Sequence, residues 1–199
     1  MPDKILYVRF SKSHFGVSLK HPLIAVLASL VLSACQSYSP QRYTAVPDNA
    51  MVLKALTGAT VRVSPFVLSA PFSASCRGGA NIDPPVNLSY PGYLQAALSD
   101  ELKVAGLYSE GSPRVTLSGD INRLEFSSTK SLTNGEWAIG LKITSTNGKV
   151  ANASVLYKFE SGFEGSSACR RTAEAFLPAV QELIAKLVRS AEFRALLEI

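Results

Sequence analysis

The amino-acid sequence predicts an α+β fold, a two-layer sandwich in which a mainly antiparallel sheet of about four strands packs against two amphipathic helices. Three observations support this prediction. Apolar and polar residues alternate along several short segments, as they do in half-buried strands. In two longer segments apolar residues recur at every third or fourth position, as they do in helices that cover a sheet. Asn-Gly pairs connect the alternating segments, as in hairpins. The expected order is strand, helix, three strands, helix.

The first expected element is an edge strand over residues 60–68, in which valines alternate with polar residues. Pro65 has no N–H to donate to a neighbouring strand, so the strand lies at an edge or stops pairing there. An unpaired edge invites strand addition by another protein. The residues expected to contact such a protein partner are Val61, Val63, Phe66 and Val67.

An irregular segment over residues 69–89 follows, with a Gly-Gly and a Pro-Pro pair. Long ordered loops are often functional, which makes this segment a second place for a partner to bind. The alternative is a surface excursion without a function of its own.

A helix is expected over residues 90–106, because Leu94, Leu98, Leu102 and Ala105 form an apolar stripe. Gly106 is placed as the glycine that ends the helix in a left-handed conformation.

Three strands are then expected to form a meander, within residues 114–127 and around 137–143 and 153–159. The apolar phase of the first changes near Asn122-Arg123, which predicts a β-bulge. Asn134-Gly135 and Asn147-Gly148 are expected to form type I′ turns between these strands.

The helical period returns over residues 168–197. Pro178 either kinks this helix or begins a second one as its first residue. Ser190 is expected to cap a final short turn. Trp137, Tyr157 and Phe159 are expected to join the two helical stripes in the core.

The N-terminal stretch has the composition of a signal peptide. An uncharged apolar run of twelve residues, 23–34, follows a basic stretch and stops at Cys35. It is too short to span a bilayer, since a transmembrane helix needs about 20 apolar residues. The run ends in Leu32-Ser33-Ala34-Cys35.

These four residues resemble the lipobox of bacterial lipoproteins. The resemblance implies that a signal peptidase recognises Leu32, Ser33 and Ala34 and cuts before Cys35, whose sulfur carries a diacylglyceryl group. The alternative is an ordinary buried cysteine that follows an apolar segment. The domain organisation expected is a removed signal peptide over residues 1–34, a lipidated flexible tether over 35–59 and one periplasmic domain over 60–199.

Together with the lipobox, the element order resembles small envelope lipoproteins of Gram-negative bacteria, in particular auxiliary lipoproteins of ABC-type lipid or lipopolysaccharide transport. This implies attachment to a membrane through covalent lipid and a protein partner in the cell envelope. Gln36 follows the lipidated cysteine, where an aspartate would imply retention in the inner membrane. The resemblance thus implies the outer membrane, facing the periplasm.

Composition narrows the function classes. After residues 1–34 are removed, 16 basic and 14 acidic residues remain, a charge of +2 that gives no reason to expect nucleic acid. Both histidines, His14 and His21, lie in the leader, which excludes Ser-His and Cys-His nucleophile pairs from the mature chain. We interpret scattered carboxylates such as Glu160 and Glu164 as a solvated face. We therefore expect no catalytic residue, no cofactor and no metal.

The two remaining cysteines, Cys76 and Cys169, are expected to form a disulfide, because an even number remains in an oxidising compartment. They lie 93 residues apart. Closing so long a loop contributes about 4.6 kcal/mol in the chain-entropy model. The alternative is two separate buried thiols.

Three functions are compatible with these observations. The first is a non-enzymatic accessory or adaptor in envelope transport or assembly, and it is the one we expect. The alternative is a carrier with an apolar cavity between helices and sheet for a small ligand or lipid. The third, a hydrolase, would need Lys, Asp or Glu in place of the absent histidine.

Overall fold

The computed structural model describes residues 37–56, 58–85 and 87–198. The chain divides into two compact units, Met1–Ala34 and Cys35–Ile199, and every described residue belongs to the second. The elements in chain order are β1 (Ser37–Tyr38), α2 (Pro47–Lys54), β2 (Val61–Val63), β3 (Val67–Leu68), η1 (Arg77–Gly79), β4 (Asn81–Ile82), α3 (Tyr90–Ala105), β5 (Val115–Ser127), β6 (Asn134–Ser145), β7 (Val150–Glu160), α4 (Gly165–Arg189) and α5 (Ala191–Leu197).

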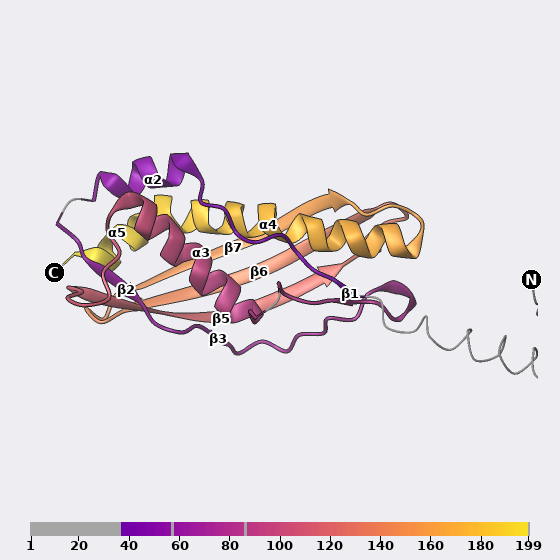
Figure 1. The fold of residues 1–199 in the computed structure, drawn as a ribbon, viewed down its shortest axis with the longest axis horizontal. Helices are drawn as coiled ribbons and strands as arrows, with labels where there is room; N and C mark the ends of the chain where they lie inside the picture. Colours follow the sequence, from indigo (N-terminus) through magenta and orange to yellow (C-terminus); the bar gives the residue numbers. More distant parts are fainter. Residues whose placement is uncertain (1–36, 57, 86, 199) are drawn as a thin grey trace, which may run out of the picture. The chain divides into compact units, whose positions relative to one another are not determined.

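The main sheet is five-stranded and mixed (Figure 1). Its strands follow the order β2, β5, β6, β7, and β3 also pairs with β5. The meander β5–β6–β7 is antiparallel, as predicted. β2 and β3, however, run parallel to β5, so the prediction of a mainly antiparallel four-stranded sheet is corrected. The reason is that α3 lies between β3 and β5, and a crossover helix returns the chain in its original direction.

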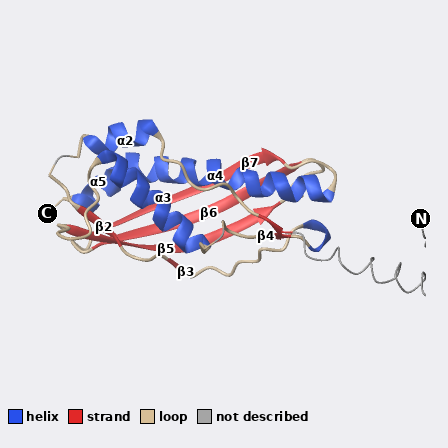
Figure 2. Ribbon diagram, in the orientation of Figure 1, coloured by secondary structure: helices blue, strands red, loops and turns tan. Residues whose placement is uncertain are grey.

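The helices lie over one face of this sheet, as Figure 2 shows. The α+β class is confirmed, but the described residues form four α-helices where two were predicted. The predicted C-terminal helix is split at Ser190, whose Oγ accepts a hydrogen bond of 3.1 Å from the Phe193 N–H and so caps α5 as expected. Pro178 lies inside a continuous α4 and begins no second helix.

The segment predicted to be a tether is folded over most of its length. β1 pairs with β4 in a separate two-stranded parallel sheet, and α2 packs against α3 and α4. Leu53 in α2 is fully buried. Residues 37–56 therefore belong to the domain, and its predicted start at residue 60 is corrected. The error arose because the segment is short and proline-rich and has no sustained apolar period.

The bulge near Asn122 is confirmed by a shift in the pairing of β5 with β6 between Ile121 and Arg123. The turns differ from the prediction. Among the described residues Asn87 is the sole non-glycine with positive φ, so Asn147-Gly148 forms a turn with positive φ at Gly148 alone. The pair at 134–135 lies in β6 rather than in a turn.

An aromatic cluster fills the space between helices and sheet. Trp137 on β6 is its centre, with ring centroids 4.7 Å from Phe176 and 4.9 Å from Phe126. The indole N–H donates a 2.8 Å hydrogen bond to the Thr172 carbonyl, which satisfies the polar atom of this fully buried side chain. Tyr157 and Phe159 pack at the margin of the core and stay partly exposed.

Candidate functional site

The predicted partner-binding edge is largely buried. Val61, Val63 and Phe66 are at most 6% exposed, and they face the core. Val67 alone of the four predicted residues is exposed, at 58%. Three of the four side chains are therefore inaccessible to a partner.

The outer side of β2 is also occupied. The Val61 N–H donates to the Leu107 carbonyl at 2.8 Å, and the Val61 carbonyl accepts from the Ser109 N–H at 2.8 Å. The Val63 carbonyl accepts from the Gln95 side chain. β2 is thus an edge strand, as predicted, but these three outward backbone groups already have partners. For β2 the prediction of an unpaired edge is therefore wrong, because the segment after α3 folds back over this strand.

The predicted disulfide is confirmed, since Cys76 and Cys169 are bonded at 2.05 Å. It joins the 69–89 segment to α4. This segment contains β4, η1 and the buried side chains of Ala80 and Ile82, so part of it belongs to the core. The loop prediction is confirmed only for the stretches between these elements.

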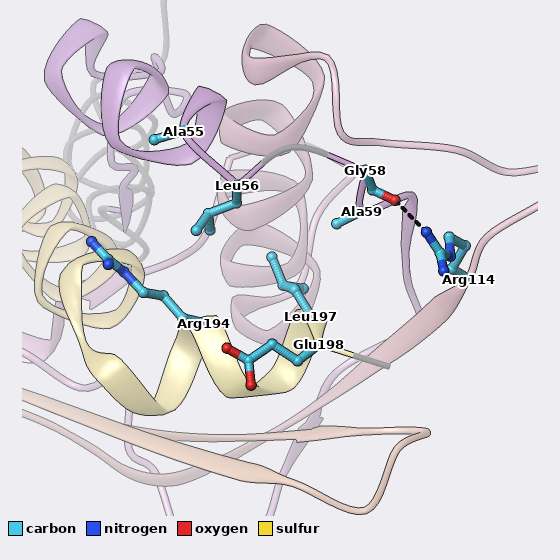
Figure 3. Close-up of a pocket in the computed structure, with 8 residues that line it drawn as sticks. All are labelled: Ala55, Leu56, Gly58, Ala59, Arg114, Arg194, Leu197 and Glu198. Carbon is cyan, nitrogen blue, oxygen red and sulfur yellow. Dashed lines mark hydrogen bonds between the residues drawn. The ribbon is translucent and has the colours of Figure 1, made fainter.

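A cavity of about 520 Å³ opens at the end of the domain formed by the start of β5, the α2–β2 connection and α5 (Figure 3). Two guanidinium groups, one carboxylate and two leucine side chains surround it. The lining residues are Ala55, Leu56, Gly58, Ala59, Arg114, Arg194, Leu197 and Glu198.

The two guanidinium groups of this cavity differ in their partners. The guanidinium of Arg114 donates a 2.9 Å hydrogen bond to the Gly58 carbonyl, which holds the α2–β2 connection against β5. Arg194 is exposed on α5 and has no ion pair among the described residues. The cavity therefore has mainly polar walls, with a carboxylate and an exposed guanidinium that has no ion pair among the described residues, a chemistry that suits a polar or charged peptide segment better than a purely apolar molecule.

The N-terminal segment is anchored at a buried carboxylate. Glu101 on α3 is fully buried, and its Oε1 accepts hydrogen bonds from the Tyr43 hydroxyl at 2.5 Å, the Val46 N–H at 3.0 Å and the Asn49 amide at 3.0 Å. Burial raises the pKa of Tyr43 above its ordinary value, and the bond to Glu101 raises it further. Three donors from residues 37–56, which we call the N-terminal strap, thus converge on one carboxylate.

No group of three or more His, Cys, Asp or Glu side chains among the described residues is placed to hold a metal ion. Nor does any helix of the described part have the length and apolarity to cross a bilayer.

Glu164, interpreted from sequence as a solvated carboxylate, is exposed but caps α4 by accepting from the N–H groups of Ser166 and Ser167.

The predicted lipidation and cleavage residues, Leu32, Ser33, Ala34 and Cys35, lie outside the described residues. The cavity and the role of Glu101 were not predicted. Their residues are drawn from segments far apart in the chain, so no local pattern could have indicated them. The one signal in the sequence that could have indicated the buried carboxylate was the position of Glu101, a charged residue beside the apolar stripe of the helix over residues 90–105.

Comparison with known proteins gives the fold alone. No family model matches the chain, and no curated protein matches it. Among solved structures, the protein XCC0632 from Xanthomonas campestris, described under the family DUF330, aligns with a TM-score of 0.52 and 15% identity, over 80% of this chain and 96% of that one.

Two further structures align more weakly. The hypothetical protein CT253 from Chlamydia trachomatis has a TM-score of 0.42 and 10% identity, over 67% of this chain and 95% of its own. A protein from Caulobacter crescentus, described as a candidate lipoprotein, has a TM-score of 0.37 and 16% identity, over 74% of this chain and 95% of its own. Of these three alignments, the one with the Xanthomonas protein shows a shared fold.

Proposed function

We propose that this protein is a lipid-anchored envelope lipoprotein, modified at Cys35, that acts as a non-enzymatic accessory or adaptor in envelope transport or assembly. The observation that carries the proposal is the sequence Leu32-Ser33-Ala34-Cys35 at the end of a short apolar run. A diacylglyceryl group on Cys35, with a further N-acyl chain, exceeds what stable anchoring requires. The absence of an aspartate at position 36 supports the outer membrane, facing the periplasm.

The geometry of the domain supports an adaptor that presents its cavity away from the membrane. Cys35 is two residues from Ser37 in β1, so its Cα lies within about 7 Å of the Ser37 Cα whatever the conformation between them. Figure 1 shows β1 near the end of the domain where β5 ends. Arg114 in the cavity directly precedes the thirteen-residue β5, and thirteen residues of strand extend roughly 40 Å.

The packing of the interior does not favour the apolar carrier. The space between the helices and the sheet is occupied by fully buried side chains, among them Trp137, Tyr93 and Phe176. A cavity for a lipid would have to displace these aromatic contacts, and close packing of this kind resists such a change.

The anchor is tested by labelling cells with radioactive palmitate and fractionating their membranes. The wild-type chain should incorporate label and stay with the outer membrane, whereas Cys35→Ser should do neither. A Cys35→Ser form that fractionates as the wild type does would refute lipidation at this residue.

The adaptor role is tested by photocrosslinking in intact cells, with a crosslinking amino acid at Arg194 in the cavity. The matched control carries it at Asn152, which is exposed on β7. We expect position 194 to capture a specific component of a transport or assembly complex and position 152 to capture none. Equal capture of abundant porins at both positions would count against the role.

A further inference from the structure

The end of the domain that carries β1 exposes two large apolar side chains. Leu132 is 79% exposed and Phe163 is 78% exposed, more than any other large apolar side chain among the described residues. Leu132 lies in the β5–β6 connection, residues 128–133, and Phe163 in the β7–α4 connection, residues 161–164. We call these two connections the apolar tip.

The two side chains of the apolar tip belong to one surface. Together with Arg77, Thr129 and Ser131 they line a shallow hollow of about 240 Å³. Arg77 has no carboxylate partner within ion-pair distance among the described residues, so a cation stands beside the two apolar groups. Lys130, in the same connection as Leu132, is paired with Glu136 at 2.7 Å. Apolar side chains beside a cation are what the interface of a phospholipid bilayer accommodates.

Hydrogen bonds hold the apolar tip in a fixed shape. The Ser161 hydroxyl donates to the Ser128 carbonyl at 2.8 Å, and the Ser161 N–H donates to the Thr133 carbonyl at 2.7 Å. The guanidinium of Arg77 donates to the Ser128 and Phe163 carbonyls and so bridges both connections. Phe163 is therefore exposed on a braced loop, and its exposure is not an incidental feature of a frayed one.

The same Arg77 links the apolar tip to the point where the chain enters the domain. Arg77 begins η1, which is separated from β4 by one residue, and β4 pairs with β1 through Asn81 and Ser37. The Ser37 hydroxyl also donates to the Asp83 carboxylate at 2.5 Å. Figure 1 shows β1 at the same end of the domain as the turns that follow β5 and β7. Since Cys35 is within about 7 Å of Ser37, a lipid on Cys35 would bring the bilayer to this end of the domain.

We propose that the apolar tip is a second membrane contact, in which Leu132 and Phe163 insert into the phospholipid interface beside the lipid anchor, while Arg77 braces the two connections that carry them. The inference rests on the proposed lipidation of Cys35. It goes further because it gives the domain an orientation: the strands of the sheet stand away from the bilayer, with the cavity at their far end. The acyl chains on Cys35 alone would leave that orientation unspecified.

The test is fluorescence quenching by brominated lipid. The lipidated protein, as Leu132→Trp or Phe163→Trp, is reconstituted into vesicles of phosphatidylethanolamine and phosphatidylglycerol that contain phosphatidylcholine brominated high on its acyl chains. The native Trp137 is fully buried and gives the same background in every variant. Met51→Trp is the matched control, because Met51 is 66% exposed but lies on α2 at the other end of the domain.

We expect the tryptophans at 132 and 163 to lose roughly a third or more of their emission, because interfacial insertion of about 5–10 Å reaches the bromine atoms. The tryptophan at 51 should lose none. Adding Phe163→Glu to Leu132→Trp should abolish the loss at 132, since a carboxylate with no hydrogen-bond donor resists insertion, whereas the carboxylate of Glu164 in the same connection is held by Ser166 and Ser167 at the start of α4. Insertion is thereby distinguished from mere closeness to the bilayer.

Two results would overturn the inference while leaving the lipoprotein proposal in place. One is palmitate-labelled, vesicle-bound protein in which positions 132 and 163 are quenched no more than position 51. The other is quenching at 132 that Phe163→Glu does not change. Absence of palmitate from Cys35 would instead overturn the proposed function, and this inference with it.

Discussion

Phe66 and Gly119 show how single residues decide this fold. A Cβ added at Gly119 would lie 2.5 Å from Cδ1 of the Phe66 ring, so the ring rests directly on the glycine backbone. Phe66 lies between β2 and β3, both of which pair with β5, and its ring fills the place where a side chain from β5 would stand. The residue that the sequence indicated as a partner contact therefore has a structural role.

Gly119→Ala should destabilise the domain by about 1–3 kcal/mol, because an added methyl group forces the Phe66 ring out of its place. Gly111→Ala is the matched control, since a Cβ there would meet nothing within 4 Å and its φ is not positive. Urea unfolding followed by circular dichroism measures both. Equal urea midpoints for the two variants would show that the Phe66 ring can move aside without loss of stability.

Glu101 is the second single residue on which the fold depends, because it binds a segment more than fifty residues away in the chain. Glu101→Ala should cost roughly 3 kcal/mol, because it leaves the donors of Tyr43, Val46 and Asn49 buried without an acceptor. Asp100→Ala is the control on the neighbouring position, where an exposed pair with Lys103 is worth at most about 1 kcal/mol. Both values come from denaturant titration. If the two variants lost the same stability, the strap would not depend on Glu101.

At the scale of elements, helix ends were predicted better than turns. The glycine cap of α3 is confirmed, with Gly106 at a φ of 76°, and so is the Ser190 cap of α5. These signals are local, because a cap needs one residue and the turn beside it. The prediction of a turn at Asn134-Gly135 was wrong because the glycine is needed for packing and not for a turn. A Cβ at Gly135 would lie 2.4 Å from the Phe159 ring, which packs over the glycine from β7.

The cap of α4 should make stability depend on acidity. Hydrogen bonds from the Ser166 and Ser167 side chains and N–H groups lower the pKa of Glu164 from 4.5 to about 2. The unfolded chain therefore binds more protons than the folded one between these values, and stability rises with pH across that window. The contribution is fully present above pH 4.5 and is lost as the pH falls towards 2.

Glu164→Gln should accordingly be less stable than the wild type at neutral pH, and the difference should shrink from pH 4.5 towards pH 2. Thermal unfolding in a pH series measures it. Ser167→Ala, which removes one of the hydroxyl donors, should reduce the same pH dependence. A difference between Glu164→Gln and the wild type that stays constant over this range would contradict the assigned cap.

At the scale of the whole molecule, the N-terminal strap is part of the fold. Leu53→Ala should cost about 2–5 kcal/mol, because the side chain is fully buried in the core. Met51→Ala on the same helix is the control and should change stability by no more than about 0.5 kcal/mol. Chemical denaturation compares them. A flexible tether would predict no effect from either substitution.

The sequence by itself determined the elements with strong local signals: the helix over residues 90–105, the meander, the bulge near Asn122 and the pairing of Cys76 with Cys169. Apolar period, caps and cysteine number are properties of short segments or of composition, so they can be read without knowing what lies beside them. The resemblance of residues 32–35 to a lipobox is also a local pattern, and lipidation at Cys35 stays a prediction.

Only the tertiary structure decided the rest, because the deciding contacts join residues far apart in the chain. β2 and β3 lie parallel to β5 because α3 crosses between them, and the outer side of β2 is closed by residues 107–109. The strap is ordered because Glu101, more than fifty residues away, gathers its donors. The free energy of such contacts depends on which surfaces meet, and a pattern within one segment carries no information about that.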